Sequence, residues 1–168
     1  DTIDYSGSLA GVTVRLDGTA SSGGDAAGDT ILNVEHVIGS GLDDTIIGTG
    51  VNETLEGGAG DDTLVGGSGA DTLDGGAGFD TADYSSSGGI SVRMDGLAGT
   101  AGDANGDILL NIEKVIGSSL ADIIIGSANA DTIVGGSGDD IISPGLGADT
   151  LDGGRGGDGV EGTWRHGA

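Results

Sequence analysis

A nine-residue period constrains this chain more than any other feature of its sequence. GGAGDDTLV at 57–65 is followed directly by GGSGADTLD at 66–74 and GGAGFDTAD at 75–83, and the period extends back to Gly39. A second run with the same period covers 117–161, which gives ten nonapeptides in two arrays. Short repeats fold by stacking on one another, because a single unit cannot bury its own apolar side chains. The sequence therefore predicts a solenoid.

The two arrays belong to a longer tandem duplication. DTIDYS at the start of the chain recurs as DTADYS from Asp80, and LNVEHVIGS recurs as LNIEKVIGS 78 residues further on. The predicted first unit is 1–79, with linking coils at 1–38 and an array at 39–83. The predicted second unit is 80–157, with linking coils at 84–116 and an array at 117–161. A tail follows at 158–168.

Each position of the nonapeptide has a physical role. Glycines at positions one, two and four allow positive φ and bring carbonyl oxygens together where a Cβ would obstruct them. The aspartate at position six adds a carboxylate to the turn. The aliphatic residue at position eight lies in a three-residue strand, and its neighbours face the other way. The predicted core is about one side chain thick and consists of Ile46, Leu55, Leu64, Leu73, Ile124, Ile133, Ile142 and Leu151.

The charge of the chain limits what it can bind. The 168 residues include 28 acidic and 5 basic side chains, a formal net charge of −23, and only 2% are aromatic. Nucleic acid and anionic membranes both require clustered Lys and Arg, so neither is an expected partner. Cysteine is absent, which excludes disulfides and thiolate metal sites and leaves hard oxygen ligands. We expect the chain to bind cations and to be largely disordered without them.

The sequence has neither a membrane-spanning pattern nor an arrangement typical of an enzyme. No apolar run approaches the roughly 20 residues of a membrane span, and no charged segment followed by an apolar stretch resembles a signal peptide. His36 is replaced by Lys114 in the second unit, so no nucleophile and base recur around it. We predict that the chain is not an enzyme and that its export signal lies outside this sequence.

Four nonapeptides fit the pattern G-G-x-G-x-D-x-U-x best, where U is a large aliphatic residue: 57–65, 66–74, 75–83 and 135–143. By this pattern the chain is identified as a member of the repeats-in-toxin (RTX, haemolysin-type) calcium-binding family. The resemblance implies an all-β fold, a right-handed parallel β-roll (β-solenoid) with calcium in its GGxGxD turns. Two nonapeptides make one coil in that family, so turns eighteen residues apart stack and share one Ca²⁺, an ion that accepts carbonyl and carboxylate oxygens.

The resemblance also places several Ca²⁺ ions, the expected cofactor, between turns that lie eighteen residues apart. The turns that fit the pattern best give a site with Asp62, Asp80 and the carbonyls of Gly58, Gly60, Gly75 and Ala77. The counterpart in the second array has Asp140, Asp158 and the carbonyls of Gly136, Gly138, Gly153 and Arg155. Arg155 would contribute only its backbone, and its charge would weaken that site.

Other pairs of turns depart from the pattern, and we expect weaker sites there. One has Glu53 and Asp71 with the carbonyls of Gly66 and Ser68, and another has Asp131 and Asp149 with the carbonyls of Ser127, Asn129, Pro144 and Leu146. The weakest pairs are Asp44 with Asp62 and Asp122 with Asp140, because leucines stand at the fourth position of the upper turns. We interpret the turns that carry Asp44 and Asp122 mainly as capping coils.

The linking segments 5–38 and 84–116 contain alternating apolar residues, which predict extra coils or a short hairpin packed on the roll. Extending the nine-residue register backward puts Glu35 and Glu113 at the ligand position. We favour a solvated glutamate before a strand over metal ligation at both. The sequence DANGD at 103–107 begins like an EF-hand loop, but a lysine stands where the final glutamate is required, so we predict a surface loop.

Together these features predict an extracellular calcium-binding structural module that folds on Ca²⁺ binding after secretion and forms a rigid rod, stalk or filament segment, as in an adhesin or surface layer. The resemblance implies a bacterial protein, exported by type I secretion and located outside the cell or on its surface. The alternative is the C-terminal secretion and folding domain of a secreted enzyme or toxin. The expected partners are Ca²⁺ and neighbouring repeats end to end. Residues 1–4 align with the second half of a nonapeptide, so we expect a preceding nonapeptide or a stacked subunit there.

Overall fold

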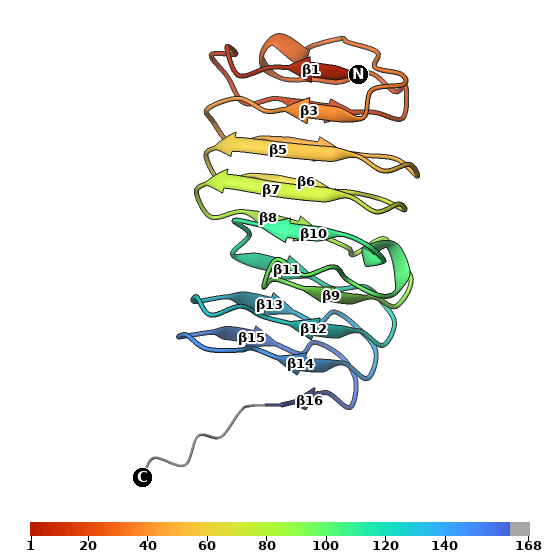
Figure 1. Ribbon diagram of the computed structural model, residues 1–168, viewed down its shortest axis with the longest axis vertical. Helices are drawn as coiled ribbons and strands as arrows, with labels where there is room; N and C mark the ends of the chain where they lie inside the picture. Colours follow the sequence, from red (N-terminus) through yellow and green to blue (C-terminus); the bar gives the residue numbers. More distant parts are fainter. Residues whose placement is uncertain (162–168) are drawn as a thin grey trace.

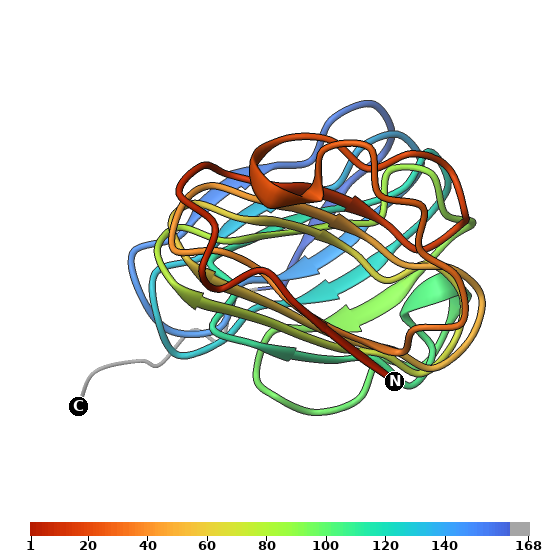
Figure 2. The same ribbon diagram turned by 90° about the horizontal axis from the view of Figure 1, so that it is seen from above.

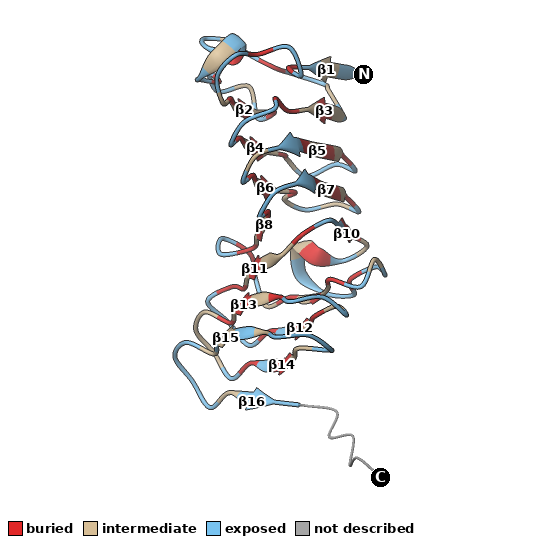
Figure 3. Ribbon diagram, turned by 90° about the vertical axis from the view of Figure 1, so that its left-hand side faces the viewer, coloured by how far each residue is buried: buried red, intermediate tan, exposed pale blue. Residues whose placement is uncertain are grey.

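The structure, a computed structural model, describes residues 1–161 and consists of short strands wound into a flattened roll (Figure 1). Seen along its long axis, the successive coils superpose as an oval (Figure 2). The side view shows the strands in two columns that face each other (Figure 3). The helical segments of the described part are two 3-10 turns, η1 (Gly24–Ala26) and η2 (Gly102–Ala104), and no helix there is long and apolar enough to cross a membrane.

The strands of the roll have two or three residues each, apart from the six-residue β5 and β7. In chain order they are β1 (Thr2–Asp4), β2 (Thr13–Arg15), β3 (His36–Ile38), β4 (Thr45–Ile47), β5 (Thr54–Ala59), β6 (Thr63–Val65), β7 (Thr72–Ala77), β8 (Thr81–Asp83), β9 (Ser91–Arg93), β10 (Ile108–Leu110), β11 (Lys114–Ile116), β12 (Ile123–Ile125), β13 (Thr132–Val134), β14 (Ile141–Ser143), β15 (Thr150–Asp152) and β16 (Gly159–Val160).

The strands form two faces. One face is a seven-stranded sheet in the order β15-β13-β11-β8-β6-β4-β2. The opposite face carries a five-stranded sheet, β1-β3-β5-β7-β10, and a four-stranded sheet, β16-β14-β12-β9 (Figure 3). Every pairing between these strands is parallel. The prediction of an all-β, parallel β-roll is confirmed.

The nine-residue period sets the register of the roll. Successive nonapeptides alternate between the two faces, so strands that pair lie eighteen residues apart, as in Ile46↔Leu64 and Leu55↔Leu73. The residue at position eight points between the two faces, and its two neighbours are more exposed. Leu151 is only partly buried, because β15 is the last strand of its sheet. The other predicted core residues are fully buried: Ile46, Leu55, Leu64, Leu73, Ile124, Ile133 and Ile142.

The linking segments form both extra coils and a hairpin-like fold. β2 pairs with β4 and β9 pairs with β12, so each segment begins with a coil of the roll. The chain then turns back through an antiparallel bridge, Thr13↔Ser22 in the first unit and Ser91↔Ala101 in the second, before η1 or η2. The sequence predicted extra coils or a short hairpin, and each linking segment contains both: a coil first and a hairpin-like turn after it.

The two units meet at a seam that the nine-residue period does not predict. β8 pairs with β11 through Ala82↔Val115, and β7 pairs with β10 through Leu73↔Leu109. β1 lies in the five-stranded sheet, whereas β8, its counterpart in the duplication, lies in the seven-stranded sheet. Equivalent strands of the two units therefore lie on opposite faces of the roll. The unit boundaries at residues 79 and 157 stay a prediction.

The predicted tail begins with residues that belong to the roll. Gly159 and Val160 form β16, which pairs with β14 through Ile142↔Val160 within the predicted array at 117–161, and the boundary of the tail at residue 158 stays a prediction. The strand forms because GGRGGDGVE at 153–161 keeps the nonapeptide spacing despite its departures from the pattern. The remaining tail residues, 162–168, lie outside the described residues.

Candidate metal sites

Acidic residues line the two edges of the roll, one from each nonapeptide and two, Asp107 and Glu113, from the second linking segment. Each stands directly before its strand, so one carboxylate is held at every turn. We call the turns that lead into the seven-stranded sheet the first row, and the turns that lead into the opposite face the second row. The first row carries Asp44, Asp62, Asp80, Glu113, Asp131 and Asp149. The second row carries Glu53, Asp71, Asp107, Asp122, Asp140 and Asp158.

In all of these carboxylates except Glu53 and Asp131, one oxygen accepts a hydrogen bond from the neighbouring coil. Asp80 Oδ1 accepts a hydrogen bond from the backbone N–H of Asp62 (2.8 Å), and Asp62 Oδ1 accepts one from Asp44 (2.8 Å). In the second row, Asp158 Oδ1 accepts the N–H of Asp140 at 3.3 Å. Such ladders hold all six predicted pairs in adjacent coils, the other three being Glu53 with Asp71, Asp122 with Asp140 and Asp131 with Asp149.

The turns are of two kinds, according to whether the second carboxylate oxygen has a hydrogen-bond donor. In Asp62, Asp71, Asp80 and Asp140, Oδ2 is buried and has no hydrogen-bond partner among the described residues. These four residues are at most 1% exposed. A buried carboxylate oxygen without a donor is costly unless a cation compensates it. Burial is also the main reason why the pKa of Asp62 and that of Asp71 rise to about 7.

The turns with serine or threonine at position two satisfy both oxygens from within the chain. Ser40 donates its backbone N–H and its hydroxyl to Asp44, and Ser118 does the same for Asp122. Within the same turn, Ser127 donates to both oxygens of Asp131, and Thr49 donates to both oxygens of Glu53. A carboxylate with two protein donors has less need of a cation, which agrees with our interpretation of the first turns as caps.

Glycine at position two changes the turn because it has positive φ. The φ angle is 112° at Gly58, 97° at Gly76 and 109° at Gly136. A Cβ on Gly76 would also overlap the carbonyl oxygen of Gly58 in the coil above, where above means nearer β1 in Figure 1. Serine in this conformation would be strained, so the GG turns have no hydroxyl donor like that of Ser40.

The first glycine of the turn marks a small space lined by oxygens. A Cβ on Gly57 would overlap Asp62 Oδ2 and lie 2.7 Å from the carbonyl oxygen of Gly75 in the coil below. A Cβ on Gly135 would lie 2.5 Å from Asp140 Oδ2 and 2.6 Å from the carbonyl oxygen of Gly153. The carboxylate of one coil and a carbonyl of the next therefore meet where the glycine leaves room. Hard oxygens of these two types are the ligands that calcium prefers.

The predicted carbonyl ligands differ in how free they are. The carbonyls of Ala77 and Arg155 each accept a backbone hydrogen bond, from Gly60 (3.0 Å) and Gly138 (2.8 Å). A carbonyl oxygen has a second lone pair, so these bonds do not prevent ligation. Among residues 1–161 no three acidic or histidine side chains converge on one point. Carbonyls would therefore have to supply much of the coordination of any ion.

Sequence reasoning missed two acidic residues of the linking segments. Asp107 is not in a surface loop as predicted: it is fully buried, with Oδ1 accepting the N–H of Asp71 (2.9 Å) and Oδ2 the hydroxyl of Tyr84 (2.8 Å). Glu113 is not simply solvated, since its Oε2 accepts the N–H of Asp80 (2.9 Å). Both continue the carboxylate ladder between nonapeptide turns. For Glu113 the sequence signal was the nine-residue register, which places it at the ligand position. For Asp107 it was only the recurrence of its flanking residues in both units.

Comparison with known families agrees with this geometry. The family described as RTX calcium-binding nonapeptide repeat (4 copies) matches residues 47–82, 116–151 and 125–160. These stretches contain all four carboxylates that have an unpartnered buried oxygen. The comparison with curated proteins found no match.

Proposed function

The chain belongs to the RTX calcium-binding nonapeptide repeat family, and we propose that it is an extracellular structural module that binds several Ca²⁺ ions and folds as it binds them. The observation that carries this proposal is the set of four buried Oδ2 atoms without a donor, in Asp62, Asp71, Asp80 and Asp140. Each follows a GG turn, and each needs a positive charge that residues 1–161 do not supply.

Folding and calcium binding are coupled by the charge and the thin core of this chain. The net charge of −23 opposes compaction, and the stacked carboxylates of each row lie in adjacent coils. A core one side chain thick has little apolar area with which to offset that repulsion. When a site does not exist in the unfolded chain, the free energy of metal binding becomes free energy of folding.

We assign the ions to the GG turns. Asp62 with Asp80 and Asp140 with Asp158 would each hold one ion, together with carbonyls of the turns they join. Asp71 contributes a free oxygen, but its upper partner Glu53 is already capped by Thr49, so we expect a weaker site there. We expect no ion at the turns that begin with GS and carry Leu at position four, which act as caps.

The cellular setting is also a proposal. Calcium sites of extracellular modules work at roughly 10⁻⁴ to 10⁻³ M, a concentration that the cytosol does not reach. A bacterial chain of this kind would stay unfolded during type I secretion and fold outside the cell. A C-terminal folding domain of a secreted enzyme or toxin would use the same coupling, and the sequence of the full-length gene decides between the two. We propose no catalytic role for the described residues.

The test of this function is folding in the presence and absence of the ion. At pH 8, the far-ultraviolet circular dichroism signal of β structure should develop in millimolar Ca²⁺ and disappear in excess EGTA. Mg²⁺ should not replace Ca²⁺, because it requires a smaller, octahedral site and retains its waters. A β signal that persists in EGTA would contradict the proposal.

We further propose that the roll is one segment of a longer rod, continued end to end by units of the same sequence. GDILLN in the second unit contains β10, which pairs with β7, whereas the matching GDTILN of the first unit forms no strand. At the seam, the N–H of Asp71 donates to Asp107 Oδ1 (2.9 Å) and the N–H of Ile108 donates to the carbonyl of Asp71 (2.8 Å).

The first unit offers the same groups without a partner among the described residues. Asp29 Oδ2 accepts the hydroxyl of Tyr5 (2.8 Å), as Asp107 accepts that of Tyr84, but Asp29 Oδ1 accepts nothing. At the other end of the roll, β15 is the last strand of its sheet, as β7 would be without β10. A further unit could add its GDTILN segment to β15. β1 of the added unit and β16 of the present chain both correspond to β8, so they would compete for the same place in the sheet. The shorter strand, the two-residue β16, would be displaced.

Asn33 and Asn111 provide a matched test of the rod. Asn111 Nδ2 donates to Asp74 Oδ1 (2.7 Å) across the seam, so Asn33 of an added unit would face Asp152. Asn33→Asp should reduce self-association in Ca²⁺, measured by sedimentation velocity, and leave thermal stability unchanged. Asn111→Asp adds the same charge but should lower stability instead, because it puts two carboxylates together within the chain. A wild-type chain that stays monomeric at all concentrations would contradict the rod.

A further inference from the structure

The turn at 75–80 has an unpartnered carboxylate oxygen but no nonapeptide turn below it. Asp80 is 0% exposed and its Oδ2 has no hydrogen-bond partner among the described residues. In the GG turn at 57–62, the oxygen in the same position faces a carbonyl of the turn eighteen residues further on. The coil below 75–80 is β11, whose residues lie 33 positions further on and belong to a linking segment.

Asn111 supplies the missing carbonyl in that coil. A Cβ on Gly75 would overlap the carbonyl oxygen of Asn111 and lie close to the side chain of Asp80. Gly57 has the same relation to the carbonyl oxygen of Gly75 and to Asp62. The carbonyl of Asn111 therefore occupies the position that a first-glycine carbonyl occupies in the nonapeptide sites.

The backbone of Asn111 is held in an uncommon conformation to do this. Its φ is 49°, and among the described residues Asn33 is the only other non-glycine residue with positive φ. Asparagine tolerates this region better than most residues, but backbone of this kind persists only where its surroundings fix it. Asn111 Nδ2 donates to Asp74 Oδ1 (2.7 Å), which fixes the side chain across the seam.

Glu113 takes the place of the lower aspartate. Its Oε2 accepts the N–H of Asp80 (2.9 Å), as Asp80 Oδ1 accepts the N–H of Asp62. The backbone N–H groups of Glu113 and Lys114 both donate to the carbonyl of Asp80 (3.1 and 2.9 Å), which holds the two coils together. The other carboxylate oxygen of Glu113 accepts no hydrogen bond from the described residues and is left for a ligand.

We propose that the seam binds a Ca²⁺ ion of its own through Asp80 Oδ2, the carbonyl of Asn111 and the carboxylate of Glu113. This inference rests on the proposed calcium-dependent function and extends it to residues outside the nonapeptide pattern. The ion joins the last nonapeptide turn of the first array to the linking segment of the second unit. It therefore links the two units in addition to the β8–β11 and β7–β10 pairings.

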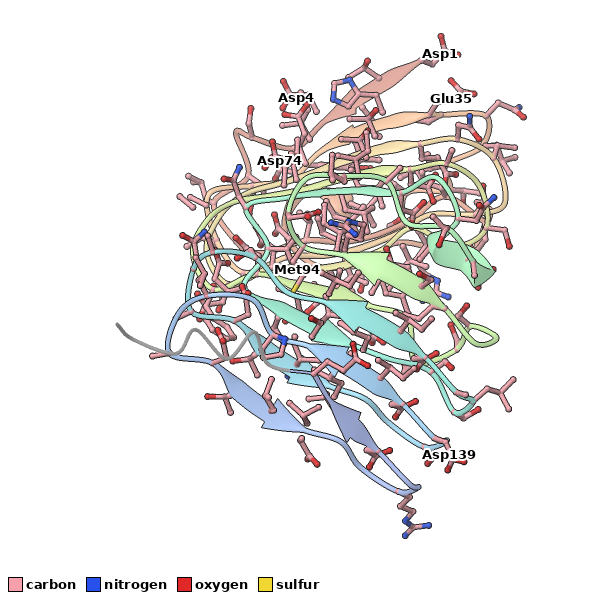
Figure 4. The ribbon with its side chains drawn as sticks, turned by 60° about the horizontal axis from the view of Figure 1, so that its bottom comes forward. Asp1, Asp4, Glu35, Asp74, Met94 and Asp139 are labelled. Carbon is pink, nitrogen blue, oxygen red and sulfur yellow. The ribbon has the colours of Figure 1, made fainter. Side chains whose placement is uncertain are left out.

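The first unit contains a natural control for this site. Glu35 and Asn33 correspond to Glu113 and Asn111, and Asn33 has a similar φ of 55°. Among the described residues no GG turn lies above them. Glu35 instead lies beside Asp1 at the N-terminal end of the roll (Figure 4), where its Oε2 accepts a hydrogen bond from the amino terminus (2.5 Å). Glu35 therefore has the same sequence context as Glu113 without the upper half of the site.

The experiment compares Glu113→Gln with Glu35→Gln in the full chain by isothermal titration calorimetry with Ca²⁺. It is done at protein concentrations at which sedimentation velocity shows a monomer, so that no second chain completes the site at Glu35. We expect Glu113→Gln to bind one ion fewer than the wild type, or that ion at least about tenfold more weakly, and Glu35→Gln to match the wild type. Unchanged stoichiometry and affinity in Glu113→Gln would overturn the inference. Equal losses in both variants would overturn it as well. If the wild type binds no calcium, the proposed function fails, and the two failures are thereby distinguished.

Circular dichroism in saturating Ca²⁺ checks that each variant folds. If Glu113→Gln does not fold, Glu113→Asp replaces it, because a shorter carboxylate keeps the charge and withdraws its oxygen from the site. We then expect the wild-type number of ions with one bound more weakly. An affinity in Glu113→Asp equal to that of the wild type for every ion would contradict the inference.

Discussion

Asp62→Asn and Asp44→Asn test the distinction between metal-binding and capping turns within one row. Both aspartates are nearly fully buried, and Oδ1 of each accepts a backbone N–H from the coil above, from Asp44 (2.8 Å) and from Val12 (2.7 Å). They differ at Oδ2, which accepts the N–H of Ser40 in Asp44 and has no partner in Asp62. An amide keeps one acceptor oxygen and the shape of the side chain, so Asp44→Asn loses the hydrogen bond from the N–H of Ser40, whereas Asp62→Asn loses a charged calcium ligand.

The magnitude follows from mass action on the lost ion. A site with a Kd of about 10⁻⁴ M adds about 2.7 kcal/mol to the free energy of unfolding when the Ca²⁺ concentration is about a hundred times the Kd. We expect Asp62→Asn to lower the free energy of unfolding by about that much. Each tenfold change in Ca²⁺ should alter this loss by about 1.4 kcal/mol. Asp44→Asn should cost about 1–3 kcal/mol from weakened hydrogen bonds, and this cost should not depend on Ca²⁺.

The assay is urea unfolding, followed by circular dichroism at several Ca²⁺ concentrations above saturation. The free energy of unfolding of the wild type and of Asp44→Asn should rise in parallel with the logarithm of the Ca²⁺ concentration. For Asp62→Asn the slope should be smaller by the contribution of one ion. Equal slopes for all three proteins would refute the assignment of calcium to the GG turn.

Three further predictions concern other parts of the site. Asp80→Ala should lower the calcium stoichiometry in calorimetric titration while Asp103→Ala leaves it unchanged, and equal titrations would contradict the assignment to turns. Gly76→Ala should prevent folding in Ca²⁺, because φ is 97° and a Cβ would overlap a backbone carbonyl, whereas Gly41→Ala meets nothing within 4 Å and should fold normally by circular dichroism. Burial raises the pKa of Asp62 to about 7. Without calcium, the stability that comes from protonated Asp62 should therefore be complete below the ordinary carboxyl pKa and lost as pH rises through 7. A calcium-free β signal in circular dichroism that grows from pH 5 to pH 8 would disprove this.

The sequence was sufficient to predict the features that follow from the nine-residue period. The period indicated that Leu55, Leu73, Ile46 and Leu64 would be buried. The family resemblance, which implies two nonapeptides to a coil, indicated that Leu55 would lie over Leu73 and Ile46 over Leu64. The pairing of carboxylates eighteen residues apart follows from the same register. Nothing in the pattern alone showed that Ser40 would cap Asp44, because that depends on where the serine N–H points in the folded turn.

The seam could not be predicted because its contacts are not periodic. β10 pairs with β7 at a separation of 36 residues, and β11 pairs with β8 at a separation of 33. Asp107 looked like part of a polar loop, and only the folded chain shows that it meets Asp71 and Tyr84. Pairings of this kind depend on the path of an irregular segment, which the alternation of apolar residues does not determine.

The most direct test of calcium binding in the turns is to locate the ions in crystals of the full chain grown with CaCl₂. Anomalous scattering of calcium, recorded at long wavelength, distinguishes it from water and from magnesium. We predict anomalous peaks between the turns at 57–62 and 75–80 and between those at 135–140 and 153–158, and none beside Asp44 or Asp122. A structure with no anomalous peak at the GG turns, or with peaks at the capped turns instead, would contradict this account.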